Sequence, residues 1–361
     1  MRRSLPLADT RTARPVEAPP RPEGFGEDGL PLLRDAHDRV YTYLRLSLTD
    51  RCNLACVYCM PPGGELEHAL RPELLSFEEV VRLVAVMSEM GIRRVRFTGG
   101  EPLVRKDVVQ LVEMVRRATA VDELVMTTNA VRLTELAAPL ARAGLHGVNV
   151  SLDSLDAERF RAITRGGELG PVLAGIHAAL DAGLEVKLNI VALGGANLDE
   201  AGALVDYAWS LGIVPRFIEL MPLGEAAKLP REAFAGTGDI VRALGSRLDH
   251  GAARERDGRK GPARYLPSRE FQDRKVGFIT AMSEEFCASC NRVRVTAKGD
   301  VRACLADRKA VSLRDAMREG ASDWDLAWLI HWSLGAKDAG HRFLDEDADE
   351  HERVGMSLIG G

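Results

Sequence analysis

The chain has 361 residues, of which 46% are hydrophobic and 28% are charged, and its formal net charge is −5. This composition is typical of a soluble globular protein, and the acidic balance gives no general basic field that would favour nucleic acid or an anionic membrane. The sequence after Met1 lacks the long apolar core of a signal peptide, and no stretch approaches the roughly 20 apolar residues that span a bilayer. We therefore expect a cytoplasmic protein.

The first 36 residues carry six of the 17 prolines and little apolar pattern. We interpret 1–36 as a disordered extension, and the alternative is a short strap that packs on the domain. From Tyr41 onward, short runs rich in β-branched residues alternate with amphipathic helical segments. The pattern predicts strands at 41–48, 93–98, 123–128, 147–152, 184–192 and 213–220, and helices at 76–90, 107–118, 133–143, 171–182 and 198–210.

Strands that alternate with helices pair in parallel through right-handed crossovers. Six such units form either a doubly wound sheet or an incomplete (β/α) barrel, and both place functional groups at the carboxyl ends of the strands. Polar or small clusters follow five of the predicted strands, so we expect a site at that edge. These clusters begin at Thr49, Thr98, Thr127, Ser151 and Glu219.

The pattern changes after residue 221. A polar, glycine-rich stretch at 222–263 precedes predicted strands at 277–280, 292–296 and 301–304 and helices at 311–319 and 323–335. We therefore divide the chain into an extension at 1–36, a barrel at 37–221 and a C-terminal region at 222–361. The strands at 292–296 and 301–304 would form a hairpin. If its turn centres between Lys298 and Gly299, Cys304 lies opposite Val293. Cys304 is then close to Cys290, and the hairpin closes a metal site.

The six cysteines form two triplets. The first has C-x3-C-x2-C spacing, which is unlike the four-ligand pattern of tetrahedral zinc but suits an iron–sulfur cluster. Three thiolates would leave the fourth iron of a cubic cluster open to a ligand. The alternative interpretation of this motif is a loop with three buried cysteines and no metal. The members are Cys52, Cys56 and Cys59.

The second triplet is Cys287, Cys290 and Cys304. Its spacing alone admits either an iron–sulfur cluster or zinc with one outside ligand. Arg292 and Arg294 follow directly, and residues two apart on a strand share a face, so the pair forms a fork suited to phosphate. The alternative for this pair is a solvated hairpin face.

The first triplet, with Tyr58 before its last cysteine and Gly-Gly-Glu-Pro at 99–102, resembles the radical S-adenosylmethionine (SAM) superfamily. The resemblance implies an α/β fold, an incomplete (β/α)6 TIM-like barrel. It also implies a [4Fe–4S] cluster whose open iron chelates SAM and, once reduced, releases a 5′-deoxyadenosyl radical. The SAM-binding residues it implies are Tyr58, Gly100, Glu101, Ser151 and Met221.

Within that superfamily, the chain is similar to the GTP 3′,8-cyclase family over about 38–361. The similarity is carried by Leu44–Ser47, Thr127–Asn129, Arg216–Met221, the Cys-Asn-Arg-x-Arg block and the terminal Gly-Gly. It implies a second [4Fe–4S] cluster, in the C-terminal extension, whose open iron binds the guanine of GTP. The radical would remove the ribose C3′ hydrogen, and the C3′ radical would add to guanine C8. The product would be (8S)-3′,8-cyclo-7,8-dihydroguanosine 5′-triphosphate, in the first step of molybdenum cofactor biosynthesis.

The same similarity assigns the substrate residues. Arg292 and Arg294 would be catalytic together with the first cysteine triplet. A triphosphate needs several cations, and a cation inside a barrel strand, such as Arg96 or Lys187, is costly unless the barrel interior is wet or holds an anion. The implied GTP-binding residues are Arg45, Arg96, Thr127, Lys187, Arg292, Val293 and Arg294, with Arg94 and Arg216 as further candidates.

Other expectations concern partners and alternatives. We expect a reducing electron donor, a monomer or homodimer, and a hand-over of product to the next pathway enzyme. The tail Gly360–Gly361 is expected to reach the active site, and the alternative is a frayed end. Ala130 stands where the family has glycine, so we expect a turn that does not rely on positive φ there. The competing functions are a radical SAM peptide-modifying maturase with an auxiliary cluster and a non-enzymatic metal scaffold.

Overall fold

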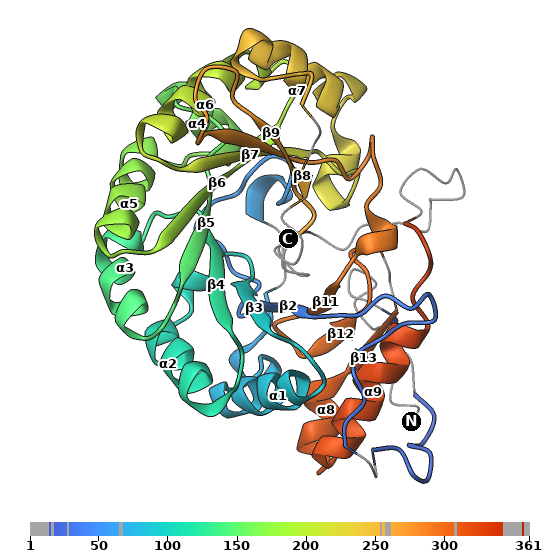
Figure 1. The fold of residues 1–361 in the computed structure, drawn as a ribbon. Coiled ribbons are helices and arrows are strands. Elements are labelled where there is room, and N and C mark those ends of the chain that lie inside the picture. Colours follow the sequence, from blue (N-terminus) through green and yellow to red (C-terminus); the bar gives the residue numbers. More distant parts are fainter. Residues whose placement is uncertain are drawn as a thin grey trace, which may run out of the picture.

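A computed structural model describes residues 14–15, 18–26, 29–64, 68–252, 255–256, 261–306, 309–341 and 356. Within these residues, six parallel strands curve into an open barrel with helices on its outer face (Figure 1). This is the incomplete (β/α)6 barrel that the resemblance to the radical SAM superfamily implies, and not the doubly wound sheet that the strand pattern also allowed. The strands are β2 (Tyr43–Ser47), β3 (Arg94–Thr98), β4 (Glu123–Thr128), β5 (Gly147–Ser151), β6 (Glu185–Ala192) and β7 (Val214–Glu219).

Six helices connect the barrel strands. The predicted helices are present, and α4, which the sequence analysis missed, is an additional short helix that follows β5. The bounds are α1 (Phe77–Glu89), α2 (Val108–Ala118), α3 (Leu133–Arg142), α4 (Ala157–Thr164), α5 (Leu169–Asp181) and α6 (Ala201–Ser210). Short 3-10 turns lie at η1 (Pro62–Gly64), η2 (Arg71–Glu73), η3 (Pro102–Val104), η4 (Leu198–Glu200), η5 (Gly224–Lys228), η6 (Arg231–Ala233), η7 (Gly245–Arg247) and η8 (Cys287–Ser289).

Helix α1 shows why these segments fold as predicted. Its N-cap Ser76 accepts a hydrogen bond from the Glu79 amide at 3.1 Å, and the Glu79 carboxylate accepts one from the Ser76 amide at 2.7 Å. Val80, Leu83 and Met87 recur at helical spacing and are buried against the sheet. The core therefore lies between the outer face of the barrel and its helices, and the barrel interior is left for polar groups.

The C-terminal region extends the barrel at both edges. Strand β10 (Lys275–Ile279) pairs in parallel with β7, and β11 (Arg292–Val295) pairs in parallel with β2. The segment between β10 and β11, which contains Cys287 and Cys290, therefore runs between the two edges of the open barrel. The remaining elements are β1 (Arg14–Pro15), α7 (Thr237–Leu244), β8 (Glu255–Arg256), β9 (Arg264–Pro267), β12 (Asp300–Arg302), β13 (Lys309–Ser312), α8 (Leu313–Arg318) and α9 (Asp323–Gly335).

The β11–β12 hairpin forms as predicted, but its register differs by one residue. Arg294 pairs with Arg302, so the continued ladder brings Cys304 level with Arg292 rather than with Val293. The reason is a three-residue turn that ends at Gly299, whose φ is +87°. One residue of register reverses which face a side chain occupies, so the shift brings Arg302 onto the face of Arg294.

The described part of the N-terminal segment packs on α9. Arg21 forms an ion pair with Asp325 at 2.9 Å. The Trp328 indole donates to the Pro19 carbonyl at 2.8 Å, and the Phe25 ring lies 5.2 Å from that of Trp328. Residues 1–13, 16–17 and 27–28 lie outside the described residues, as does the Gly360–Gly361 tail.

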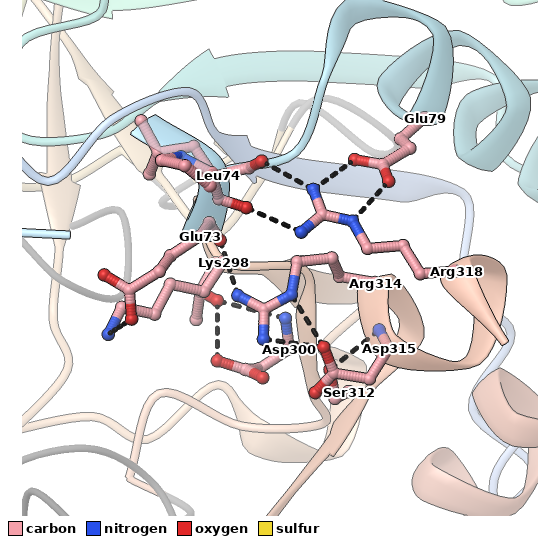
Figure 2. A network of polar contacts seen from close by, with 11 residues as sticks. Glu73, Leu74, Glu79, Lys298, Asp300, Ser312, Arg314, Asp315 and Arg318 are labelled. Atoms are coloured by element: carbon pink, nitrogen blue, oxygen red, sulfur yellow. Dashed lines mark hydrogen bonds and ion pairs between the residues drawn. The ribbon is translucent and has the colours of Figure 1, made fainter. Parts of the chain in front are cut away.

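A polar network fastens the C-terminal layer to the chain that follows the first cysteine triplet (Figure 2). Arg318 of α8 donates to both carboxylate oxygens of Glu79, at 2.8 and 3.1 Å, and to the Leu74 carbonyl at 3.1 Å. Arg314 donates to the Glu73 carbonyl at 2.5 Å. The helix that follows the second cysteine hairpin is thus tied to the turn that leads into α1.

The turn after β4 differs from our expectation. Ala130 has a φ of 65°, in the left-handed region, although it is not glycine. The prediction that this turn would avoid positive φ is therefore wrong. The Thr128 hydroxyl accepts a hydrogen bond from the Ala130 amide at 3.0 Å, and this contact helps to hold the strained backbone.

Among the described helices, none is both long enough and apolar enough to cross a lipid bilayer.

Candidate active site

All six cysteines line one cavity of about 310 Å³ inside the barrel. The first triplet follows the carboxyl end of β2. The second triplet lies at the opposite end, because Cys290 precedes the amino end of β11, which runs parallel to β2. Arg292 is level with Tyr43, four residues before Ser47, so at about 3.3 Å per residue roughly 13 Å of strand β2 separates these two levels.

Burial is the main influence on the pKa values of the Cys52 and Cys56 thiols in the first triplet. Cys52 Sγ accepts a hydrogen bond from the Leu54 amide at 3.4 Å and faces the Asn129 amide nitrogen at 3.9 Å. Burial raises the pKa of Cys52 to about 11 and that of Cys56 well above its usual value. These thiols therefore stay protonated until a metal displaces the protons, which is the behaviour expected of cluster ligands held away from water.

The second triplet is surrounded by cations. Cys290 Sγ lies 3.5 Å from the Lys337 ammonium and 3.9 Å from the Arg292 guanidinium. Burial raises the pKa of Cys290, but Arg292 and Lys337 outweigh burial and lower it to about 6. Arg39, which precedes β2, donates to the Cys287 carbonyl at 3.0 Å and so fixes the loop. This end of the cavity suits an anionic thiolate cluster.

The outside ligand that a zinc site would need is also present. Glu285, Cys287 and His341 bring one ligand atom each to within 4.8 Å of one another. Geometry alone therefore allows either zinc or an iron–sulfur cluster at the second triplet. Three cysteines at 287, 290 and 304 that all line the shared cavity favour a cluster with an open iron.

The glycine pair after β3 allows close approach of backbone. Gly99 has a φ of +151°, and a Cβ at Gly100 would overlap the Arg51 carbonyl. Glu101 is 2% exposed, and burial raises its pKa to about 7. Its oxygens accept hydrogen bonds from the Leu103 amide at 3.0 Å, the Thr128 hydroxyl at 2.7 Å and the Asn129 amide at 2.7 Å. Glu101 therefore joins two strand-end loops as well as lining the cavity.

Tyr58 is fixed by a carboxylate that the sequence analysis did not single out as a site residue. Its hydroxyl donates to Asp153 at 2.6 Å, and Asp153 also accepts from the Val191 amide at 2.8 Å. Burial raises the pKa of Asp153 to about 6. The aromatic ring before Cys59 is thereby held against the ends of β5 and β6.

A row of arginines crosses the barrel wall between the two triplets. Arg294 of β11, Arg45 of β2 and Arg96 of β3 are register partners on adjacent strands, about 4.8 Å apart. Burial lowers the pKa of Arg45 well below its usual value, and Arg294 acts in the same direction. Like charges on neighbouring strands destabilise a sheet, so this row implies an anion in the cavity.

Unsatisfied donors support the same conclusion. Within the described residues, the Nε groups of Arg216 and Arg294 are buried and have no hydrogen-bond partner. Buried donors in native proteins are almost always paired, so such groups in a cavity wall indicate a ligand with acceptor oxygens.

Most of the predicted site residues come together here. The cavity is lined by all six cysteines, by Tyr58, Gly100, Glu101, Ser151 and Met221, and by Arg45, Arg96, Thr127, Arg216, Arg292 and Arg294. Three are not among its lining residues. Val293 packs in the core, Lys187 pairs with Glu185 at 2.7 Å, and Arg94 pairs with Glu123 at 3.0 Å.

The sequence analysis missed several residues of this site, among them Tyr43, Asp153, Asn189 and Lys337, which all line the cavity. Tyr43 was within reach of the pattern, because it precedes Arg45 by two residues and shares its face of the strand. Lys337 had no signal, since only the fold brings the end of α9 to Cys290.

The fold and the cysteine loop define a radical SAM protein. The sequence model of the Radical SAM superfamily matches residues 46–208, and that of Molybdenum Cofactor Synthesis C matches residues 213–343. The crystal structure of SuiB from Streptococcus suis superposes with a TM-score of 0.55 over 90% of this chain and 74% of that chain. At 14% sequence identity it supports the fold alone.

Curated relatives show to which family within the radical SAM superfamily the chain belongs. The GTP 3′,8-cyclase of Heliobacterium modesticaldum is 45% identical over 332 residues, covering 91% of this chain and 99% of the relative. That of Caulobacter vibrioides is 42% identical over 356 residues, covering 98% and 99%. The chain belongs to the GTP 3′,8-cyclase family. Its cofactors are accordingly S-adenosylmethionine and [4Fe–4S] clusters.

Proposed function

We propose that this protein converts GTP to (8S)-3′,8-cyclo-7,8-dihydroguanosine 5′-triphosphate, the first step of molybdenum cofactor biosynthesis. The observation that carries the proposal is the pair of cysteine triplets at opposite ends of one arginine-lined cavity. Such an arrangement places a radical source and a nucleotide end to end.

At the carboxyl end of the barrel, Cys52, Cys56 and Cys59 would hold the first cluster, which with SAM would supply the 5′-deoxyadenosyl radical that removes the C3′ hydrogen. Gly100 lets the loop after β3 pack against the cysteine loop, because a side chain there would overlap the Arg51 carbonyl, and we assign Gly100 to the SAM site. The remaining SAM contacts are assigned to Tyr58, Glu101, Ser151 and Met221, all of which line this part of the wall.

At the amino end, Cys287, Cys290 and Cys304 would hold the second cluster, whose open iron would bind the guanine of GTP. Arg292 and Arg294 project from the same strand face and act as the catalytic pair beside the nucleotide. Arg45, Arg96 and the Thr127 hydroxyl receive the charged part of the substrate. Val293 contributes through its backbone, since its side chain is buried in the core.

The contribution of Lys187 depends on Glu185. Burial lowers the pKa of Lys187, and Glu185 opposes that effect through their ion pair. Lys187 lies at the amino-terminal part of β6, where its register partner is Asn149, a cavity residue. We assign it to the distal phosphate, which it reaches by exchanging the Glu185 carboxylate for a phosphate oxygen.

The boundaries and surroundings follow from the same assignment. We place the barrel at 37–221 and the C-terminal region at 222–361, after the last of the six parallel strands. Clustered cysteines without disulfides suit a reducing compartment, so we place the protein in the cytoplasm. The proposal includes an external electron donor, a monomer or homodimer, and transfer of product to the next enzyme.

The test is an anaerobic reaction of the reconstituted protein with SAM, a strong reductant and GTP. We expect equal amounts of 5′-deoxyadenosine and of an isomer of GTP by mass spectrometry. ATP in place of GTP is the control for guanine recognition. SAM cleavage that never yields the GTP isomer would disprove the proposal and favour another radical SAM reaction, such as peptide modification.

A further inference from the structure

Tyr43 occupies a position in the cavity that the assignments above leave without a role. It opens β2, is 3% exposed and lines the cavity. Strand alternation places it on the same face as Arg45 and Ser47, toward the barrel interior. The Tyr43 ring occupies space that a ligand would otherwise use. The contacts of its side chain therefore indicate what role it has in the cavity.

Guanidinium groups surround the Tyr43 side chain. The ring centroid lies 5.4 Å from Cζ of Arg94 and 5.8 Å from Cζ of Arg96, both on β3. The Tyr43 hydroxyl accepts a hydrogen bond from Arg96 Nε. Arg292 of β11 is its register partner on the other side. The hydroxyl is therefore an acceptor placed inside a cluster of cations.

This contact fixes the orientation of Arg96. Its Nη1 group donates to the Met126 carbonyl at 3.2 Å and to the Thr127 hydroxyl at 3.3 Å. Among the described residues, these bonds and the bond to Tyr43 use the Nε and Nη1 groups and leave the Nη2 group for a ligand. Arg94 Nη1, on the same strand, is buried and has no hydrogen-bond partner in the described part of the chain.

We propose that Tyr43 is a positioning residue for the phosphate end of the substrate, and that its hydroxyl orients Arg96 so that the barrel favours a nucleoside triphosphate over a nucleoside. The proposal rests on the proposed function, because it takes GTP as the ligand. Its physical basis is that an oriented guanidinium loses less conformational freedom on binding phosphate than a mobile one.

The ionisation of Tyr43 adds a measurable signature. Burial raises the pKa of its phenol, but Arg96, Arg45 and Arg94 outweigh burial and lower it to about 8. Above that pH a phenolate competes with phosphate for the same cations. The charged groups that face it are Arg45 on β2, Arg94 and Arg96 on β3, Arg292 on β11 and Arg216 on β7.

The test compares wild type with Tyr43→Phe, which keeps the ring and removes only the hydroxyl. Tyr207→Phe is the control, because Tyr207 lies on α6, away from the cavity, and its hydroxyl has no hydrogen-bond partner among the described residues. Calorimetric titrations of the cluster-loaded proteins use GTP, inorganic tripolyphosphate and guanosine, at pH 7 and pH 9.

We expect Tyr43→Phe to weaken binding of GTP and tripolyphosphate about tenfold at pH 7 and to leave guanosine binding unchanged. With a pKa of about 8, wild-type affinity for GTP falls about tenfold from pH 7 to pH 9, and the variant loses this pH dependence. The wild-type pH profile is a second measurement that needs no variant.

Two outcomes would overturn the inference alone: a variant that matches wild type in GTP affinity and pH dependence, or an equal loss for guanosine and GTP, which indicates a general folding role. A wild-type protein that binds no GTP would overturn the proposed function, and this inference with it.

Discussion

Replacing Arg45 by methionine should stabilise the protein without substrate and weaken GTP binding. Arg45 stands between Arg294 and Arg96, its register partners on either side. For charges about 6 Å apart at an effective dielectric constant of about 20, each pair repels by roughly 3 kcal/mol. Methionine keeps most of the packing of the arginine stem and removes both repulsions.

The net gain is smaller than the sum of the two pairs. Contacts of the Arg45 guanidinium with its surroundings are lost, so we expect about 2 kcal/mol of added stability. At roughly 2.1 cal/mol/K per residue, a chain of 361 residues gains about 3 °C in Tm. Loss of one charge-assisted contact to phosphate costs about 1.5–3 kcal/mol, which weakens GTP binding by roughly 10- to 150-fold.

The assay is anaerobic thermal unfolding with and without GTP, together with calorimetric titration of GTP. Arg142→Met is the matched control, since Arg142 is exposed on α3, far from the cavity, and we expect its Tm to change by less than about 1 °C. A fall of several degrees in Tm for Arg45→Met, with GTP affinity unchanged, would show that Arg45 has a structural role and refute the reasoning.

Four further predictions test other parts of the site. Reconstitution should give about eight irons per chain, and a reproducible count near four with bound zinc would remove the second cluster. Cys52→Ala should abolish 5′-deoxyadenosine formation, whereas Cys304→Ala should retain some SAM cleavage but form no GTP isomer. SAM cleavage by Cys52→Ala would contradict the assignment of the first triplet to the SAM-binding cluster. Arg292→Ala should raise the Kd for GTP more than that for SAM, and equal losses would indicate a folding role. Ala130→Gly should stabilise the protein by up to about 1 kcal/mol, because φ is 65° there and glycine adopts that conformation without strain. The control Ala137→Gly, within α3, should destabilise it by about 1 kcal/mol. Urea unfolding measures both effects, and equal effects would exclude strain at Ala130.

The barrel itself was predictable because its signals are local. The Ser76–Glu79 capping box and the apolar residues of α1 are signals between residues that lie within one or two helical turns of each other in sequence. Strands β2 to β7 were placed within two residues because buried parallel strands read as short β-branched runs. Helix α4 was missed, since only Phe160 and Ile163 of its apolar side chains are buried and the segment is short.

Turn geometry was less predictable. The β11–β12 hairpin was placed correctly, but its register depended on Gly299, and a shift of one residue moved the level of Cys304. Ala130 adopts a left-handed conformation that its residue type disfavours, because Thr128 and the surrounding loop hold it there. A non-glycine residue in such a conformation costs roughly 1–3 kcal/mol, so it persists only where tertiary contacts hold it.

The sequence by itself identified the reactive groups of this protein, namely two triplets of thiols, a glycine pair and a set of arginines, because residue type and spacing are read directly from the chain. Only the tertiary structure decided where they stand. It put the triplets at opposite ends of the barrel because β11 adds to β2 in parallel. It also aligned Arg294, Arg45 and Arg96 across three strands, and brought Lys337 and Tyr43 to the cavity. Strand pairing between β2 and β11, about 250 residues apart, is set by burial and register across the whole sheet, which no local pattern contains.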